Sequence, residues 1–199
     1  MRRIMIAAAA MLTAAGTGVA FTQDGNRRFN EFLNGFQEAT VVVATTSTGT
    51  FKATINRDET EIHYVLTFKE LEGDVLQAHI HIGHPQNQGA IVLWLCETQT
   101  NPSPVSSTPS CTEDDPSNLR AGKVTGTLTA ADIAVATGTI ASGIATATPE
   151  EFAQLISLIK AGKTYVNVHS SKFQPGEIRS QLDNRDSDDG NHGKGHGDH

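Results

Sequence analysis

The chain has 199 residues, with 22 Asp and Glu against 15 Lys and Arg, and its formal net charge is −7 at pH 7. A surface that binds nucleic acid needs clustered Lys and Arg, and no such cluster follows residue 20. We therefore expect no nucleic-acid partner. The acidic balance mainly favours solubility.

The N-terminal segment has the order of a secretory signal peptide. Arg2 and Arg3 precede an apolar run at 4–12, and small residues then continue to Ala20. This order predicts a leader over 1–20 that is cleaved after Ala20. No later segment approaches the ~20 apolar residues that a membrane helix needs. We expect a secreted or periplasmic protein without a membrane span once the leader is removed.

The rest of the chain, about 180 residues, is the usual length of one domain. We expect a flexible lead-in at 21–28 and a folded domain at 29–183. Residues 184–199 contain no apolar side chain, so this tail cannot offset its ordering entropy and is predicted to be disordered. A solvated tail without a specific ligand is favoured over weak capture of divalent metal by its histidines, which are His192, His196 and His199.

Short runs of β-type residues follow one another at regular spacing. Such a pattern predicts an all-β fold, an antiparallel Greek-key sandwich or barrel with one or two short helices. The expected strands are 39–45, 49–56, 61–68, 75–82, 90–96, 122–128, 164–169 and 177–182.

One helix has clear start and stop signals. Thr148 is placed to cap its N-terminus, Pro149 occupies the first helical position, and Glu151 completes a capping box. Apolar residues then recur at helical spacing until Gly162 ends the helix. A shorter helix is expected after Thr129 on similar grounds.

The two cysteines, Cys96 and Cys111, are predicted to form a disulfide because exported proteins meet an oxidising environment. The alternative is a pair of free thiols in a reducing compartment. Their number and spacing exclude a zinc site of the CxxC type.

Residues 77–83 alternate between polar and apolar side chains. If this segment is a strand, Ala78, Ile80 and Ile82 point into the core while His79 and His81 share the opposite face. Two rises of ~3.3 Å put their Cβ atoms roughly 6 to 7 Å apart. Two imidazoles at that separation can converge on a single metal ion.

The same alternation in the strand expected at 164–169 places Asn167 and His169 on the polar face. The following strand directs Glu177 and Arg179 to that face as well. If these strands are neighbours, we expect Arg179, Glu177 and Asn167 to lie beside the histidines, where they would hold an anion or orient the ligands.

Three neutral imidazoles suit copper or zinc and leave one coordination position open. We therefore predict a surface metal site formed by His79, His81 and His169. His63 and His84 are candidates for a fourth ligand. The alternative is an ordinary solvent-facing set of polar side chains that bond across strands.

Several motifs resemble, in the same order, those of the CHRD domain, the module named after chordin. The opening LNGFQE at 33–38 is similar to its L-x-G-x-Q-E, and AHIH at 78–81 to its A-H-I-H. AGKTYVNVH at 161–169 and PGEIRSQL at 175–182 are similar to its closing motifs. The resemblance covers roughly 29–183.

This resemblance implies an extracytoplasmic, non-catalytic binding module whose partner is an unidentified protein or small molecule. A weaker resemblance, in motif order only, is to the copper-zinc superoxide dismutases, through His79, His81, His169 and Arg179. It implies a copper redox enzyme as an alternative, although the zinc-binding loop of those enzymes is missing. A metal-free protein-interaction module is the third alternative.

Overall fold

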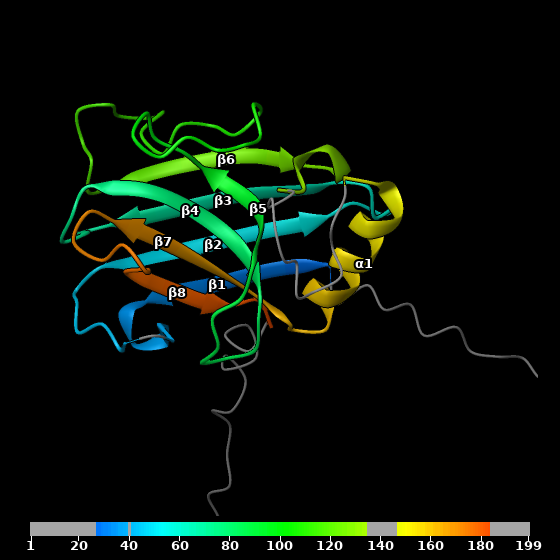
Figure 1. Ribbon diagram of the computed structural model, residues 1–199, viewed down its shortest axis with the longest axis horizontal. Coiled ribbons are helices and arrows are strands. Elements are labelled where there is room, and N and C mark those ends of the chain that lie inside the picture. The colour runs from blue at the N-terminus through cyan, green and yellow to red at the C-terminus, as the bar shows by residue number, and fades with distance from the viewer. Residues whose placement is uncertain (1–26, 40, 135–146, 184–199) are drawn as a thin grey trace, which may run out of the picture.

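The computed structural model describes residues 27–39, 41–134 and 147–183 (Figure 1). The expected signal peptide, most of the expected lead-in and the histidine-containing tail lie outside these residues. The described residues therefore cover the predicted domain except for residues 40 and 135–146.

Eight strands form one antiparallel sheet that is nearly closed on itself, which confirms the predicted fold class. Its strand order is β5-β4-β7-β8-β1-β2-β3-β6. The strands are β1 (Arg28–Asn34), β2 (Thr48–Ile55), β3 (Ile62–Lys69), β4 (Val75–Ile82), β5 (Ile91–Cys96), β6 (Gly122–Leu128), β7 (Thr164–Ser170) and β8 (Ile178–Gln181).

The connections decide which strands are neighbours (Figure 1). β1, β2 and β3 form a meander, and β8 returns to lie beside β1, as a strand does in a Greek key. β4 and β5 form a hairpin, and β7 pairs with both β4 and β8. This topology places the three strands that carry the candidate site residues side by side.

The core lies between the inward faces of the curved sheet. β2 and β3 alternate buried and more exposed side chains along their length, so that Phe51 and Leu66 are completely buried. Burying a side chain of this size contributes about 1.5–3 kcal/mol. The hydroxyl of Tyr64 crosses the core and donates to the carbonyl of Leu95 at 2.6 Å, which joins β3 to β5.

Helix α1 (Pro149–Lys160) lies at one end of the sheet (Figure 1). Thr148 Oγ1 accepts a hydrogen bond from the Glu151 backbone at 3.2 Å, and Gly162 adopts a φ of +67° that few other residues tolerate. The short helix η3 (Ala130–Asp132) begins at Thr129 with a capping box. No helix in the described ranges is both long and apolar enough to cross a membrane.

The strand predicted at 39–45 is wrong. The chain instead forms the short helix η2 (Gly35–Gln37), and the described residues that follow it up to 47 are irregular. Val43 N donates to the Gly35 carbonyl at 3.0 Å, so the segment folds back on η2. A Cβ at Gly35 would lie 2.2 Å from the Val43 oxygen, so only glycine permits this approach.

β1 was not among the predicted strands because polar residues dominate it. Its side chains nevertheless alternate, with Phe29, Glu31 and Leu33 buried. Its whole length pairs with β2. Cross-strand pairing and burial therefore override weak intrinsic strand preference here.

The predicted disulfide between Cys96 and Cys111 is present, with the two Cα atoms 4.8 Å apart. It ties the end of β5 to the connection that leads to β6, and both residues are fully buried. The bond therefore anchors a long connection to the edge of the core.

Reduction of this disulfide should lower the free energy of unfolding by about 3 kcal/mol, because a closed loop of about 15 residues restricts the unfolded chain by that amount. Urea denaturation with and without a phosphine reductant measures the change. The double variant C96A/C111A is the control, and the reductant should leave its midpoint unchanged. An equal midpoint for the oxidised and reduced native chain would contradict the expectation.

Candidate metal centre

Two neighbouring strands bring three histidines together. β4 carries His79 and His81, and β7 carries His169. In the antiparallel register His79 faces Asn167, so His169 lies diagonally across from it on the same side of the sheet. The ligand nitrogens of the three imidazoles all lie within 4.8 Å of one another.

The pairing of β4 with β5 is irregular at His79 and His81. Against β5, the register shifts between Ala78 and His79 and again between Ile80 and His81. Such irregularities twist a strand locally and change the direction of its side chains. The β4–β7 side of the ladder remains regular from Gln77 to Ile82, which keeps His79 and His81 in step with His169.

The predicted surface position of this site is wrong, because the three side chains are buried. His79, His81 and His169 are 0%, 7% and 6% exposed. They do lie on the face opposite Ala78 and Ile80, as alternation predicts, but the connections at 83–90 and 171–177 contribute groups that contact this face. The sequence pattern alone could not show that these connections fold over the strands.

Two backbone carbonyls determine the tautomers of His81 and His169. His81 Nδ1 lies 2.9 Å from the Gly89 carbonyl, and His169 Nδ1 lies 2.7 Å from that of Gln174. A carbonyl oxygen can only accept, so each Nδ1 donates and each neutral ring keeps its lone pair on Nε2. Metal-binding histidines are typically held in this way.

His79 joins the other two through its ring. Its Nδ1 lies 3.2 Å from His169 Nε2, which accepts in the metal-free protein. The Nε2 atoms of His79 and His81 are buried and have no hydrogen-bond partner among the described residues. Trp94 contacts His79 edge-on, with ring centroids 4.3 Å apart. A buried polar atom without a partner is costly, and a metal ion would satisfy it.

Behind His81 the side chains form a stack. Tyr165 lies parallel to the His81 ring at a centroid distance of 4.7 Å. The guanidinium of Arg179 lies 3.4 Å from the Tyr165 centroid and donates to the carbonyls of Asn87 and His84 at 3.0 and 3.1 Å. The predicted neighbour Arg179 is therefore present, and it holds the 83–90 connection in place.

Burial lowers the pKa of all three histidines. The pKa of His81 falls to about 4, while those of His79 and His169 are lowered by burial as well. For His79 the charges of His169 and His81 act in the same direction. The imidazoles are therefore neutral at pH 7, the form in which histidine binds a metal.

The geometry fits one metal ion with a small adjustment. Ligand bonds of about 2.0–2.1 Å keep any two nitrogens within about 4.2 Å of each other. The widest separation here is bounded by 4.8 Å, so small ring rotations would close the set. The side-chain amide of Asn167 lies 3.1 Å from His169 Nε2, so Asn167 is next to the cluster as predicted. Because that nitrogen carries a lone pair, the amide group that faces it must be the NH2 group.

The other predicted residues lie elsewhere. His63 bonds to Thr127 at 2.9 Å and is exposed on β3, and the exposed His84 does not join the cluster. The carboxylate of Glu177 is fully buried, where it accepts from Ser47 Oγ and from the Glu72 backbone. Glu177 therefore links the connection between β7 and β8 to Ser47 and Glu72.

Sequence reasoning missed Trp94 and the two carbonyl groups that orient the ligands. Trp94 stands opposite His79 in the β4–β5 register, so its alternation within β5 was a usable signal. The carbonyls of Gly89 and Gln174 come from irregular segments, and no residue pattern predicts which carbonyl reaches an imidazole.

A family model described as the CHRD domain matches residues 29–182, which is most of the chain. The chain therefore belongs to the CHRD-domain family, and the resemblance seen in its motifs is confirmed. No curated protein and no solved structure matches the chain significantly. The resemblance to superoxide dismutases stays a prediction.

Burial of His81 should make its contribution to stability depend on pH. The pKa of His81 in the folded protein is about 4, below its ordinary value of 6.5. Between these two pH values the unfolded chain binds a proton that the folded protein does not, so the folded state loses stability as the pH falls from 6.5 to 4. The free energy of unfolding contributed by His81 should drop by about 3 kcal/mol between pH 6.5 and pH 4. The experiment compares the native chain with H81Q by urea denaturation in the presence of a chelator.

The comparison with a variant is needed because burial raises the pKa of Glu38 to about 7, which acts in the opposite direction over part of the same range. The stability difference between the native chain and H81Q should shift in favour of the variant as the pH is lowered. H63Q, which removes an exposed histidine outside the cluster, is measured alongside as the control. A pH-independent difference for H81Q would contradict the buried neutral state.

Proposed function

We propose that this CHRD-domain protein is an exported binding module that holds one copper or zinc ion through His79, His81 and His169. The proposal rests on one observation, which is the convergence of three buried imidazoles. Two of them have Nδ1 bonded to a carbonyl and a lone pair on Nε2. A purely structural histidine cluster has no need for buried nitrogens that lack partners.

The donor set favours a borderline metal. Neutral imidazole suits copper and zinc, whereas calcium and magnesium prefer oxygen ligands. The two cysteines are joined to each other and lie outside the cluster. For equal geometry Cu²⁺ binds more tightly than Zn²⁺, so we expect copper to displace zinc from the isolated protein.

When bound, the ion would supply Lewis acidity or, as copper, a redox couple. The residues of the chain would have separate tasks at such a site. The Gly89 and Gln174 carbonyls hold the rings of His81 and His169 in orientation, while Tyr165 and Trp94 limit the access of water. Three protein ligands leave one position for a small ligand.

The proposed extracytoplasmic location is supported by the disulfide, because such bonds persist in oxidising compartments. Membership of the CHRD family also supports an extracellular binding role. The leader predicted at 1–20 is the third support. The bound partner is proposed only as a protein or small molecule of the extracytoplasmic space.

Titration of the metal-free chain with Cu²⁺ or Zn²⁺ should show one tight site per molecule. H169A and H81A should each weaken that site by more than the roughly 10- to 100-fold that loss of an outer partner costs. Calorimetry in competition with a chelator of known affinity measures the change. Bound metal should also raise the melting temperature, by an amount that grows with the logarithm of the metal concentration divided by Kd.

Two controls separate this site from other histidines. H63A removes an exposed histidine and should leave the affinity unchanged. A chain that ends at Asp183 lacks His192, His196 and His199 and should keep the tight site. Equal affinity in H169A, H81A and the native chain would overturn the proposal and leave a metal-free interaction module. Superoxide decay that depends on His169 would instead assign the protein to the redox class.

A further inference from the structure

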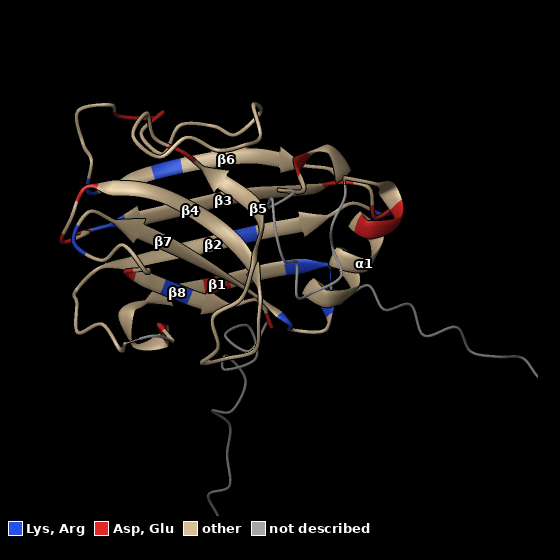
Figure 2. Cartoon of the chain, viewed as in Figure 1, with Lys and Arg blue, Asp and Glu red and all other residues tan. Residues whose placement is uncertain are grey.

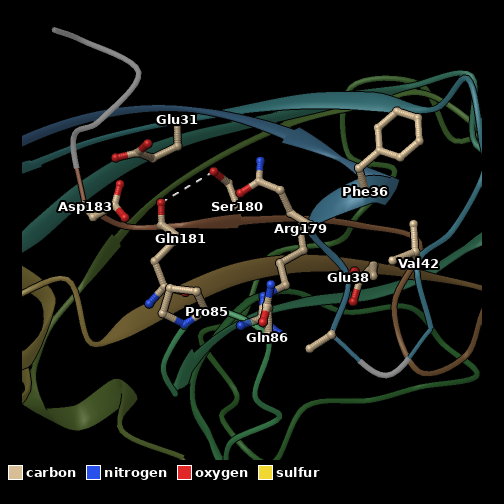
Figure 3. Close-up of a pocket in the computed structure, with 12 residues that line it drawn as sticks. Glu31, Phe36, Glu38, Val42, Pro85, Gln86, Arg179, Ser180, Gln181 and Asp183 are labelled. Carbon is tan, nitrogen blue, oxygen red and sulfur yellow. Dashed lines mark hydrogen bonds between the residues drawn. The ribbon is translucent and has the colours of Figure 1, made fainter.

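A cavity of about 700 Å³ lies beside β8 and the η2 segment (Figure 3). This volume is within the range that small-molecule sites occupy. None of the three clustered histidines is among the described residues that line it. Arg179 lines the cavity and also stacks on Tyr165, so it separates this space from the metal centre.

Acidic groups outnumber basic groups around the cavity. Among the described residues, Glu31, Glu38 and Asp183 line it together with one cation, Arg179. Figure 3 shows Glu31 and Asp183 at one side and Glu38 with Arg179 at the other. Figure 2 shows the other Lys and Arg residues spread over strands and connections. With all four groups ionised the lining therefore carries a net charge of about −2, which attracts cations.

Two buried acceptors at the cavity lack partners. Glu38 and Gln181 are only 7% and 6% exposed. Their Oε1 atoms have no hydrogen-bond partner among the residues that the structure describes, although Gln181 Nε2 donates to the carbonyls of Gly83 and Gly162. Buried acceptors of this kind need a donor, which the lining leaves for a ligand to supply.

Arg179 does not make the cavity an anion site. Its guanidinium donates to the carbonyls of Asn87 and His84 and lies on the Tyr165 ring. Its charge partly offsets the effect of burial on the pKa of Glu38, which still rises to about 7. A second cation beside Glu38 would hold this carboxylate ionised.

One wall of the cavity is apolar and accessible. Phe36 and Val42 are 71% and 62% exposed, and Pro85 lines the cavity near Gln181 (Figure 3). Figure 3 places Phe36 and Val42 on the side of the cavity where Glu38 lies. An alkyl chain on this wall would therefore end next to a carboxyl group.

We propose that the cavity binds an aliphatic primary amine, with the ammonium on Glu38 and the alkyl chain against Phe36 and Val42. An ammonium offers three donors and no acceptor, which matches a lining with unpartnered acceptors. A hydrogen bond between two charged groups is shorter and stronger than one between neutral groups, so the charge should decide which ligand binds. The inference does not depend on the metal centre.

The test is a titration of the full, metal-free chain, followed by NMR chemical shifts, with three probes of equal length. At pH 8 hexylamine should bind saturably and at least about 10-fold more tightly than hexanol, since tenfold corresponds to about 1.4 kcal/mol. Hexanoate should bind most weakly. Equal or tighter binding of hexanoate would overturn the proposal.

Variants then locate the interaction. E38Q should weaken hexylamine about 10-fold and leave hexanol unchanged, while F36A should weaken both probes alike. E150Q, which changes an exposed carboxylate on α1, should have no effect. If E38Q does not fold, the affinities of F36A for hexylamine, hexanol and hexanoate still test whether the cavity binds the amine. Unchanged hexylamine binding in folded E38Q, or in F36A, would refute the assignment.

The pH dependence supplies an independent readout. Hexylamine stays charged below about pH 10, whereas Glu38 ionises near pH 7. The described groups that act on Glu38 or share its cavity are Arg179, Tyr165, Glu31 and Asp183. Lys172 lines an adjoining cavity that Glu38 also borders. The affinity for hexylamine should therefore increase from pH 6 to pH 8 and that for hexanol should not. If the ratio of the hexylamine affinity to the hexanol affinity stayed constant from pH 6 to pH 8, Glu38 would not be the group that binds the ammonium.

Discussion

The hydrogen bonds from two imidazoles to the Gly89 and Gln174 carbonyls are the constraint on which the candidate site depends. They attach the connections at 83–90 and 171–177 to the outer face of β4 and β7. Without them the histidines would form an exposed row on a solvent face, with free rotamers and ordinary pKa values. With them the rings are buried, neutral and fixed in one tautomer, which prepares a site for a metal ion at low entropic cost.

The outer face of β4, β7 and β8 thereby becomes a second, polar interior. Its members are held by stacking and by bonds to backbone carbonyls, as the contacts of Arg179 and Tyr165 show. One carboxylate oxygen of Glu177 accepts from Ser47 and from the Glu72 backbone. Polar groups that stay unpartnered, such as His79 Nε2 and Glu38 Oε1, stand out against this background. The proposed metal ion and the proposed amine would supply partners for these atoms.

Local patterns predicted the fold well wherever a segment buries one face. The alternation in β2, β3 and β4 and the cap signals of α1 are written into consecutive residues. Local patterns failed at 39–45, where the described β-branched residues have no partner strand. They also failed at β1, where pairing with β2 makes a polar segment a strand. Strand formation depends on partners that are distant in sequence, so propensity alone cannot decide these cases.

The sequence by itself determined the family, the antiparallel class, the disulfide pair and the side of the sheet from which His79, His81 and His169 emerge, because each follows from motif order, spacing or the period of a strand. Only the tertiary structure decided that β4 and β7 are neighbours, that these rings are buried, and that Glu38 borders a cavity. Those facts depend on strand order and on irregular connections, whose paths are set by long-range contacts that no local pattern encodes.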